Sequence, residues 1–210
     1  MAAPPPRTLV IDTATAACSV ALLTDGGAVA RLYDEVGRGH AERLLPMIAE
    51  LPDGGRADAV LIDCGPGSFT GVRVGLAAAR ALGLGWDVPV RGYSSLALVA
   101  AQAFARRPDI RRVAAVLEGG HGEVFVRTYD RDLLPMGDMA SLKPDAAIER
   151  LGGTPLAGSG VHRLLALRPD LDAADLLPDA GEAWRLPLAL ASLPPRPLYG
   201  RAPDAKVKAT

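Results

Sequence analysis

Short apolar runs separated by turn residues fill the first third of the chain, a pattern typical of β-strands. Residues 7–12, 18–23 and 28–33 are apolar or β-branched, and Asp25, Gly26 and Gly27 supply a turn before the third run. Because the connections are only a few residues long, we predict that consecutive runs pair with each other. The pattern therefore predicts a three-stranded antiparallel meander at the start of the chain.

The next segment changes from strand-like to helical periodicity. Apolar positions of residues 40–51 recur at helical spacing, at Leu44, Leu45, Ile48 and Leu51. Residues 59–63 then form an apolar run that predicts a buried strand, and residues 65–71 form a glycine-rich loop. Residues 72–84 are rich in alanine and leucine and predict a helix. A strand at residues 88–90 and a helix that Ser94 or Ser95 caps and that ends near residue 106 complete an α/β lobe.

The second half begins with two further strand-like runs, at residues 112–117 and 123–129, joined by the glycine-rich residues 118–122. Residues 144–151 have a helical pattern, and residues 155–158 are strand-like. Proline and charge dominate residues 194–210, so we expect an extended tail on the surface with its last residues disordered. The segment between has weak periodicity and carries no firm prediction.

The composition indicates a globular chain without a dominant electric field. Of its 210 residues, 49% are hydrophobic, which suffices for one large domain or two small lobes. The 23 basic and 24 acidic residues give a net charge of -1, so no overall attraction to nucleic acid or membrane is expected. Two distant cysteines, Cys18 and Cys64, fit a reducing compartment. We expect a cytoplasmic protein with no targeting or membrane-spanning segment.

Two polar turns are candidates for binding an anion or a nucleotide. One is the predicted hairpin tip after the first strand, and the other is the glycine-rich loop that leads into the helix at residue 72. Backbone amides at a helix start and the helix dipole favour phosphate or carboxylate, although no GK[ST] sequence marks a Walker loop. The alternatives are an ordinary polar turn and a tight strand-to-helix connection capped by a hydroxyl. The candidate contacts are Asp12, Thr13, Thr15, Gly67, Ser68, Thr70 and Arg73.

A stripe of small residues lines one face of the predicted helix after this loop. Its members lie four residues apart, at Gly71, Gly75, Ala79 and Gly83. Glycine inside a helix costs roughly 1 kcal/mol relative to alanine, so the stripe needs a compensating close contact. That contact is either with this chain's own sheet or neighbouring helix, or with a helix of another subunit.

Other chemistry has weak support in the sequence. The histidines His40, His121 and His162 share no i, i+4 spacing, and metal sites need convergent ligands, so we predict no metal site. Ser68 lacks the G-x-S-x-G environment of a nucleophile elbow. Asp12 and Asp63 can in principle serve as acid and base, but a solvated or capping role is more common.

Taken together, these segments resemble the TsaB family, also called YeaZ. The resemblance rests on LVIDTATAACSVAL at residues 9–22, HAERLLPMI at residues 40–48 and GPGSFTGVRVGLAAARALG at residues 65–83. Residues 92–96 and PLYGRAPDAK at residues 197–206 extend it over most of the chain. The resemblance implies an α/β, two-lobed actin-like fold of the ASKHA, ribonuclease-H-like superfamily. The expected lobes are residues 1–97 and a shortened second lobe at residues 98–210.

The resemblance also implies a function. TsaB proteins are non-catalytic scaffold or activating subunits in the synthesis of tRNA N6-threonylcarbamoyladenosine. They pair with TsaD, which transfers threonylcarbamoyl to the adenosine beside the anticodon, and the ATPase TsaE joins the assembly. The HxxxH metal motif of TsaD is missing, because Leu44 follows His40 by four residues. An autonomous actin-like ATPase or kinase, or a glycoprotease-like peptidase, is the alternative.

For the partners, the resemblance implies that the two helices at residues 40–51 and 72–84 form the contact with TsaD, or with a second copy when the chain is alone. It implies no cofactor of the chain's own, ADP or ATP as a candidate ligand at the subunit boundary, and contact with tRNA through the complex. Residues 118–122 depart from the family pattern, which has an acidic residue and two arginines there. The predicted interface residues are His40, Leu44, Leu45, Ile48, Gly71, Val72, Gly75, Ala79 and Gly83.

Overall fold

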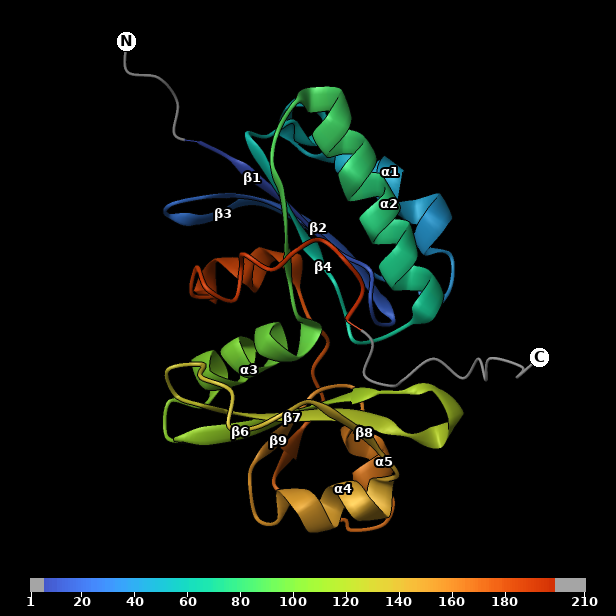
Figure 1. Ribbon diagram of the computed structural model, residues 1–210, viewed down its shortest axis with the longest axis vertical. Helices are drawn as coiled ribbons and strands as arrows, with labels where there is room; N and C mark the ends of the chain where they lie inside the picture. Colours follow the sequence, from blue (N-terminus) through green and yellow to red (C-terminus); the bar gives the residue numbers. More distant parts are fainter. Residues whose placement is uncertain (1–5, 199–210) are drawn as a thin grey trace, which may run out of the picture.

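The computed structural model describes residues 6–198 and contains two five-stranded sheets that lie one above the other in Figure 1. The first sheet has the order β3-β2-β1-β4-β5. Its antiparallel meander is β1 (Thr8–Asp12), β2 (Ala17–Thr24) and β3 (Gly27–Glu35), and its parallel strands are β4 (Ala59–Asp63) and β5 (Val90–Tyr93). The predicted meander is confirmed.

Two helices cover the outer face of this sheet, α1 (His40–Glu50) and α2 (Phe69–Trp86). Their apolar stripes pack on the outward side chains of β1, β2 and β4 and enclose one hydrophobic cluster. The short 3₁₀ turn η1 (Pro52–Gly55) follows α1. Helix α2 begins three residues earlier than predicted because the Ser68 hydroxyl accepts a hydrogen bond from the Gly71 amide and caps the helix.

The second sheet has the order β10-β9-β6-β7-β8. Its two long strands are antiparallel neighbours connected by the 3₁₀ turn η2 (Gly120–Gly122). Two helices cover its outer face, α4 (Pro144–Leu151) and α5 (Val161–Leu165). The strands are β6 (Arg112–Glu118), β7 (Val124–Asp130), β8 (Ala140–Leu142), β9 (Leu156–Ala157) and β10 (Ala173–Ala174).

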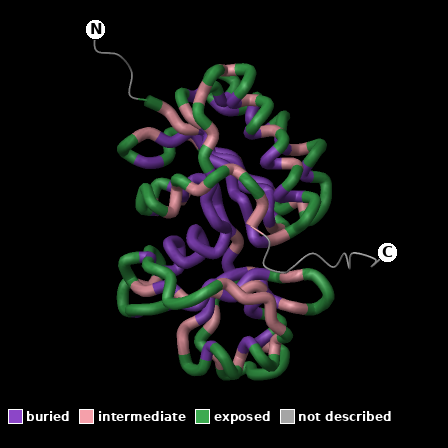
Figure 2. The backbone as a smooth tube through the Cα atoms, in the orientation of Figure 1, coloured by how far each residue is buried: buried purple, intermediate pink, exposed green. Residues whose placement is uncertain are grey.

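Between the two sheets lies α3 (Ser95–Arg106), together with the 3₁₀ helix η3 (Ala180–Arg185). Ten consecutive α3 residues, Ser95 to Phe104, are buried, which explains the nearly unbroken apolar sequence of this helix. Eight of these ten residues belong to a hydrophobic cluster that includes side chains of both sheets, and Figure 2 shows this buried zone in the middle of the molecule. The predicted lobe boundary between residues 97 and 98 therefore falls within a helix that both sheets share.

The chain returns to the first sheet after η3. Gly92 and Leu193 exchange two backbone hydrogen bonds, and the Leu198 amide donates to the Cys64 carbonyl at 2.8 Å. Gly92 permits this close approach, because a Cβ atom there would lie 3.1 Å from the Pro194 carbonyl oxygen and 3.3 Å from that of Leu193. An ion pair between Arg31 and Asp179 also ties the returning segment to β3.

Most predicted elements of the first half are present, whereas the prediction missed β8, α5, β10 and η3 in the second half. These elements have two to six residues, too few for a periodic pattern to emerge. The predicted surface tail lies mostly outside the described residues. Among the helices of residues 6–198, none is both long and apolar enough to cross a membrane.

Candidate functional site

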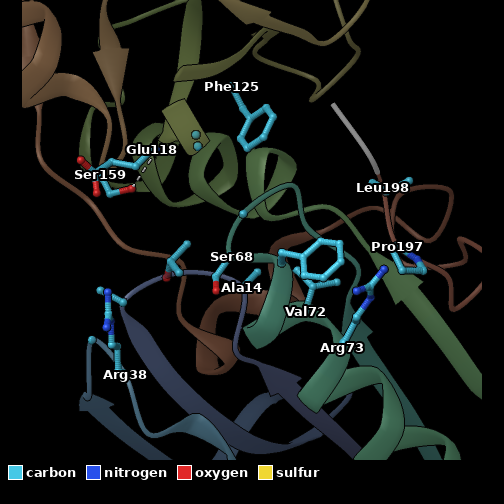
Figure 3. Close-up of a pocket in the computed structure, with 17 residues that line it drawn as sticks. Ala14, Arg38, Ser68, Val72, Arg73, Glu118, Phe125, Ser159, Pro197 and Leu198 are labelled. Carbon is cyan, nitrogen blue, oxygen red and sulfur yellow. Dashed lines mark hydrogen bonds between the residues drawn. The ribbon is translucent and has the colours of Figure 1, made fainter. Parts of the chain in front are cut away.

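A cavity of about 660 Å³ opens between the two lobes. One wall comes from the β1–β2 hairpin tip, the loop before α1 and the start of α2; the opposite wall comes from the β6–β7 turn and residue 159 (Figure 3). A volume in this range suits a small molecule of nucleotide size. The lining residues are Ala14, Thr15, Ala16, Gly37, Arg38, Gly67, Ser68, Phe69, Val72, Arg73, Glu118, Gly119, Gly120, Phe125, Ser159, Pro197 and Leu198.

The first wall is built by direct backbone contact between the hairpin tip and the glycine-rich loop. The Ser68 amide donates to the Ala14 carbonyl at 2.7 Å. A Cβ atom at Gly67 would lie 2.0 Å from that carbonyl oxygen, so only glycine fits this approach. The hydroxyl of Thr13 donates to the Gly71 carbonyl at 2.8 Å and fixes the start of α2 against the tip.

His40 holds the same hairpin tip from the side of α1. Its Nε2 lies 2.9 Å from the Thr15 carbonyl and 3.2 Å from the Ala17 carbonyl, so this nitrogen is the protonated donor. The imidazole is buried, with 7% of the residue exposed. His40 is therefore a structural clamp of the tip, which corrects its prediction as part of a partner surface.

Charges of both signs surround the cavity. Arg38 and Arg73 lie on the first wall, and the Arg73 guanidinium stacks 3.3 Å from the centre of the Phe69 ring. Glu118 lies on the opposite wall, where its carboxylate accepts a hydrogen bond from Arg163 at 3.0 Å. The Glu118 amide donates to the Ser159 hydroxyl at 3.4 Å (Figure 3). The cavity thus offers cations near the helix start and an ion-paired carboxylate across from them.

The structure brings together some of the residues predicted to contact an anion. Thr15, Gly67, Ser68 and Arg73 line the cavity. Asp12 and Thr13 are instead fully buried beneath it, and Thr70 lies on the exposed start of α2 outside the lining. Sequence reasoning missed Arg38, Phe125, Ser159 and the returning residues Pro197 and Leu198, since they come from distant segments that no local motif connects.

Beneath the cavity, the carboxyl groups of Asp12 and Asp63 are fully buried and hydrogen-bonded. The Tyr93 hydroxyl donates to Asp12 and the Ser95 hydroxyl to Asp63, both at 2.6 Å, and the Gly65 amide donates to Asp63 at 2.8 Å. Burial raises the pKa of both carboxyl groups, well above the usual range for Asp63. Since internal groups occupy these carboxyls, they have a structural role in this conformation.

The predicted interface residues need a correction. Eight of the nine lie on the buried sides of α1 and α2. Two of them, Gly71 and Gly75, approach Thr13, the residue after β1, so closely that a Cβ atom would lie 2.0 Å from its carbonyl oxygen and 2.4 Å from its hydroxyl, respectively. The small-residue stripe is therefore a contact with the chain's own sheet. Periodicity identified the buried face without identifying its neighbour. The eight are His40, Leu44, Ile48, Gly71, Val72, Gly75, Ala79 and Gly83.

The opposite, solvent-facing side of the two helices carries apolar and small residues beside charged ones such as Arg73 and Arg80. Leu45 of α1 is 56% exposed and Leu84 of α2 is 86% exposed. We call the following residues the outer helix face: Ala41, Leu45 and Ala49 of α1 and Ala77, Ala81 and Leu84 of α2, all exposed. Of the predicted interface residues, Leu45 belongs to it. Ala77 and Ala81 also lie four residues apart, so the sequence contained a pattern for this face as well as for the buried glycine stripe.

Within residues 6–198, no group of three or more His, Cys, Asp or Glu side chains is placed to hold a metal ion. The three histidines lie in different parts of the fold, on α1, in η2 and on α5.

Comparisons with known proteins identify relatives with this architecture. The family model described as TsaD, tRNA N6-adenosine threonylcarbamoyltransferase, matches residues 26–144. The solved structure of YeaZ from Pseudomonas aeruginosa superimposes with a TM-score of 0.77 and 30% identity, covering 92% of this chain and 99% of that chain. With its two sheets and the cavity between them, the protein is a two-lobed α/β protein, as predicted, and it shares this fold with YeaZ.

Sequence relatives agree with this class. TsaB from Escherichia coli is 40% identical over 154 residues, which cover 69% of this chain and 66% of that protein. An uncharacterized protein of Mycobacterium tuberculosis is 32% identical over 206 residues, covering 94% of this chain and 93% of that protein. The chain belongs to the TsaB (YeaZ) family. It spans 66% of the length of the Escherichia coli relative and 54% of that of TsaB from Haemophilus influenzae.

Proposed function

We propose that this chain is a non-catalytic scaffold or activating subunit in the synthesis of tRNA N6-threonylcarbamoyladenosine, and that it pairs directly with a TsaD-type transferase subunit. Relatives named as tRNA threonylcarbamoyladenosine biosynthesis proteins support the pathway. The outer helix face carries the proposal of pairing.

Two adjacent helices present this face from one side of the first sheet (Figure 1). Leu45 and Leu84 expose large apolar side chains, and the exposed alanines of the same helices have short side chains that would let another helix approach closely. Contiguous apolar surface on a folded protein commonly marks a contact site. Since the residues below it are packed against the sheet, this face can receive a partner without any rearrangement of the core.

The chain matches the TsaD model over residues 26–144, a range that includes both α1 and α2. A transferase of the same fold has a corresponding helix pair. Two such pairs can meet about a pseudo-twofold axis, as identical patches do in a symmetric dimer. We therefore propose that the chain forms a homodimer through the same face when alone, and that TsaD competes with the second copy.

The remaining assignments extend this proposal. The inter-lobe cavity would take the phosphates of ADP or ATP at the subunit boundary, with Ser68, the start of α2 and Arg73 as the anion-binding side. TsaE would join the pair, and tRNA would be held through the complex. Because the net charge is -1, most phosphate contacts would come from the partner.

A catalytic role for this chain would need acidic groups free to act on a substrate. Asp12 and Asp63, the two candidates from the sequence, are instead fully buried in hydrogen bonds with Tyr93, Ser95 and the Gly65 amide. Because these carboxyl groups are already engaged by internal hydrogen bonds, the structure favours a non-catalytic subunit over an autonomous ATPase, kinase or peptidase.

The test is threonylcarbamoyl transfer to tRNA in a mixture of TsaD, TsaE, threonylcarbamoyl-adenylate and ATP, with and without this chain. We expect transfer when the chain is present and none from the chain alone. Transfer at the same rate without it would refute the role, and turnover of ATP or a peptide by the purified chain would favour an autonomous enzyme.

A further inference from the structure

Two buried carboxyl groups meet where β1 and β4 end. The strands run parallel with Ile11 opposite Ile62, so the residues that follow, Asp12 and Asp63, are neighbours on the same face of the sheet. Neither residue has any exposed surface, and each carboxyl group lies close enough to the other to affect its pKa. This contact is separate from the outer helix face and lies below the cavity.

The chemistry of two neighbouring buried carboxyl groups favours a shared proton. An ionised carboxylate has only acceptor oxygens, so two of them cannot form a hydrogen bond until one is protonated. Like charges held at contact in a buried site also favour a single shared proton. The other donors, from Tyr93, Ser95 and the Gly65 amide, complete the hydrogen bonding of both groups.

Within residues 6–198, the charged groups that act most strongly on the pair are anions. Asp179 acts on Asp12 as a further anion. Burial raises the pKa of the Cys18 thiol to about 11 and that of the Cys64 thiol to about 12, and it also raises the pKa of Tyr93, so all three are neutral at pH 7. These neighbours favour the protonated form of the pair.

We propose that Asp12 and Asp63 hold one proton between them at neutral pH and act as a positioning pair for the cavity wall. The Ala14 amide, in the hairpin tip, donates to Asp12, and the Gly65 amide, at the start of the glycine-rich loop, donates to Asp63. These two segments carry Thr15 and Ser68 into the cavity lining. The shared proton therefore holds the hairpin tip and the glycine-rich loop together below the cavity, whether or not the chain pairs with TsaD.

Linkage gives the sign of the expected pH dependence. An unfolded aspartate ionises near 3.8, whereas the pKa of the folded pair is raised. The stabilisation from the proton is therefore complete below that value and is lost as pH rises toward the raised pKa. Between these two pKa values the folded state holds one more proton than the unfolded state. The folding equilibrium constant therefore falls about tenfold for each unit by which the pH rises.

Asp63→Asn tests this directly, because the asparagine amide donates to Asp12 without titrating. Urea unfolding of the full chain, between pH 5 and pH 7, gives the folding equilibrium constants of the variant and the wild type. We expect the ratio of variant to wild type to rise about tenfold for each unit of pH increase. Asp25→Asn, in the exposed β2–β3 turn, is the matched control and should leave the ratio constant. Parallel curves for Asp63→Asn and the wild type would overturn the shared proton.

The wild-type protein gives a second, independent answer. With ¹³C-labelled aspartate, one carboxyl resonance should keep its protonated chemical shift at pH 7 and be missing in Asp63→Asn. Ionised shifts for every aspartate would contradict the proposal even if the variant does not fold.

Positioning has its own readout. In Tyr93→Phe, which removes one donor to Asp12, amide exchange of residues 13–16 and 65–68 should accelerate roughly tenfold, while α4 exchanges as before. Unchanged exchange in both segments would show that the pair does not position the wall.

Discussion

Both faces of α2 carry small and apolar residues, and the exposed face also carries Arg73 and Arg80, yet the structure assigns the two faces opposite roles. Toward the sheet, the glycines bring the helix so close that an added Cβ at Gly83 would lie 2.3 Å from Val90. Toward solvent, Ala77 and Ala81 have open space, and Leu84 is 86% exposed. The first face is a closed contact inside the chain, and the second is a surface available to another molecule. A small-residue stripe therefore indicates close packing but does not identify the packing partner.

The largest expected effect comes from enlarging the closed face. Leucine at Gly75 would place its Cβ 2.4 Å from the Thr13 hydroxyl and 2.9 Å from Ile62. Such overpacking should destabilise the fold by about 3 kcal/mol, measured by urea unfolding. Ala77→Leu, two residues further on the exposed side, is the control and should stay within about 0.5 kcal/mol of wild type. Equal stability of the two variants would erase the distinction between the faces.

Next in size is the effect of a charge on the open face. Leu45→Arg should keep wild-type stability within about 0.5 kcal/mol, because the side chain is already 56% exposed. Its affinity for the TsaD subunit should nevertheless fall at least about tenfold, since a desolvated charge disfavours an apolar contact. Titration calorimetry with purified TsaD measures this. Leu134→Arg, at 61% exposure in the second lobe, is the matched control, and equal losses in both variants would remove the outer helix face as the docking surface.

A smaller effect on stability is expected from removing a single hydrogen bond on the sheet-facing side of α2. Thr13→Val removes the buried donor to the Gly71 carbonyl while keeping the side-chain volume. We expect a loss of about 1 kcal/mol in the free energy of unfolding. Thr70→Val, on the exposed start of α2, should change it by less than about 0.5 kcal/mol. A stable Thr13→Val protein would mean that packing alone seats α2 on the hairpin tip.

Much of the first lobe could be predicted because its elements are long enough to show a period. The predicted range of β4, residues 59–63, matches the structure, and α1 differs by one residue at its end. In the second lobe, β9 and β10 have two residues each and depend on pairing with β6 and with each other. Such short strands form only through pairing with strands that are distant in the sequence, so no local sequence pattern predicts them.

The candidate site was predicted in part for the same reason. Thr15, Gly67, Ser68 and Arg73 belong to segments whose turn chemistry is visible in the sequence. Phe125 and Ser159 enter the cavity from strands and turns that lie far away along the chain. Tyr93 and Ser95 join the buried carboxyls only after β5 takes its place beside β4.

The sequence by itself determined the meander, the main helices, the glycine-rich loop and membership of the TsaB family, because these depend on local periodicity, turn residues and motif content. Only the tertiary structure decided which face of α2 is buried, which aspartates face each other and which segments enclose the cavity. Those features depend on sheet order and on contacts between residues distant in the chain, such as the hydrogen bond between Thr13 and Gly71. A one-dimensional pattern records that a residue is small or acidic, whereas its neighbours in space determine what that property does.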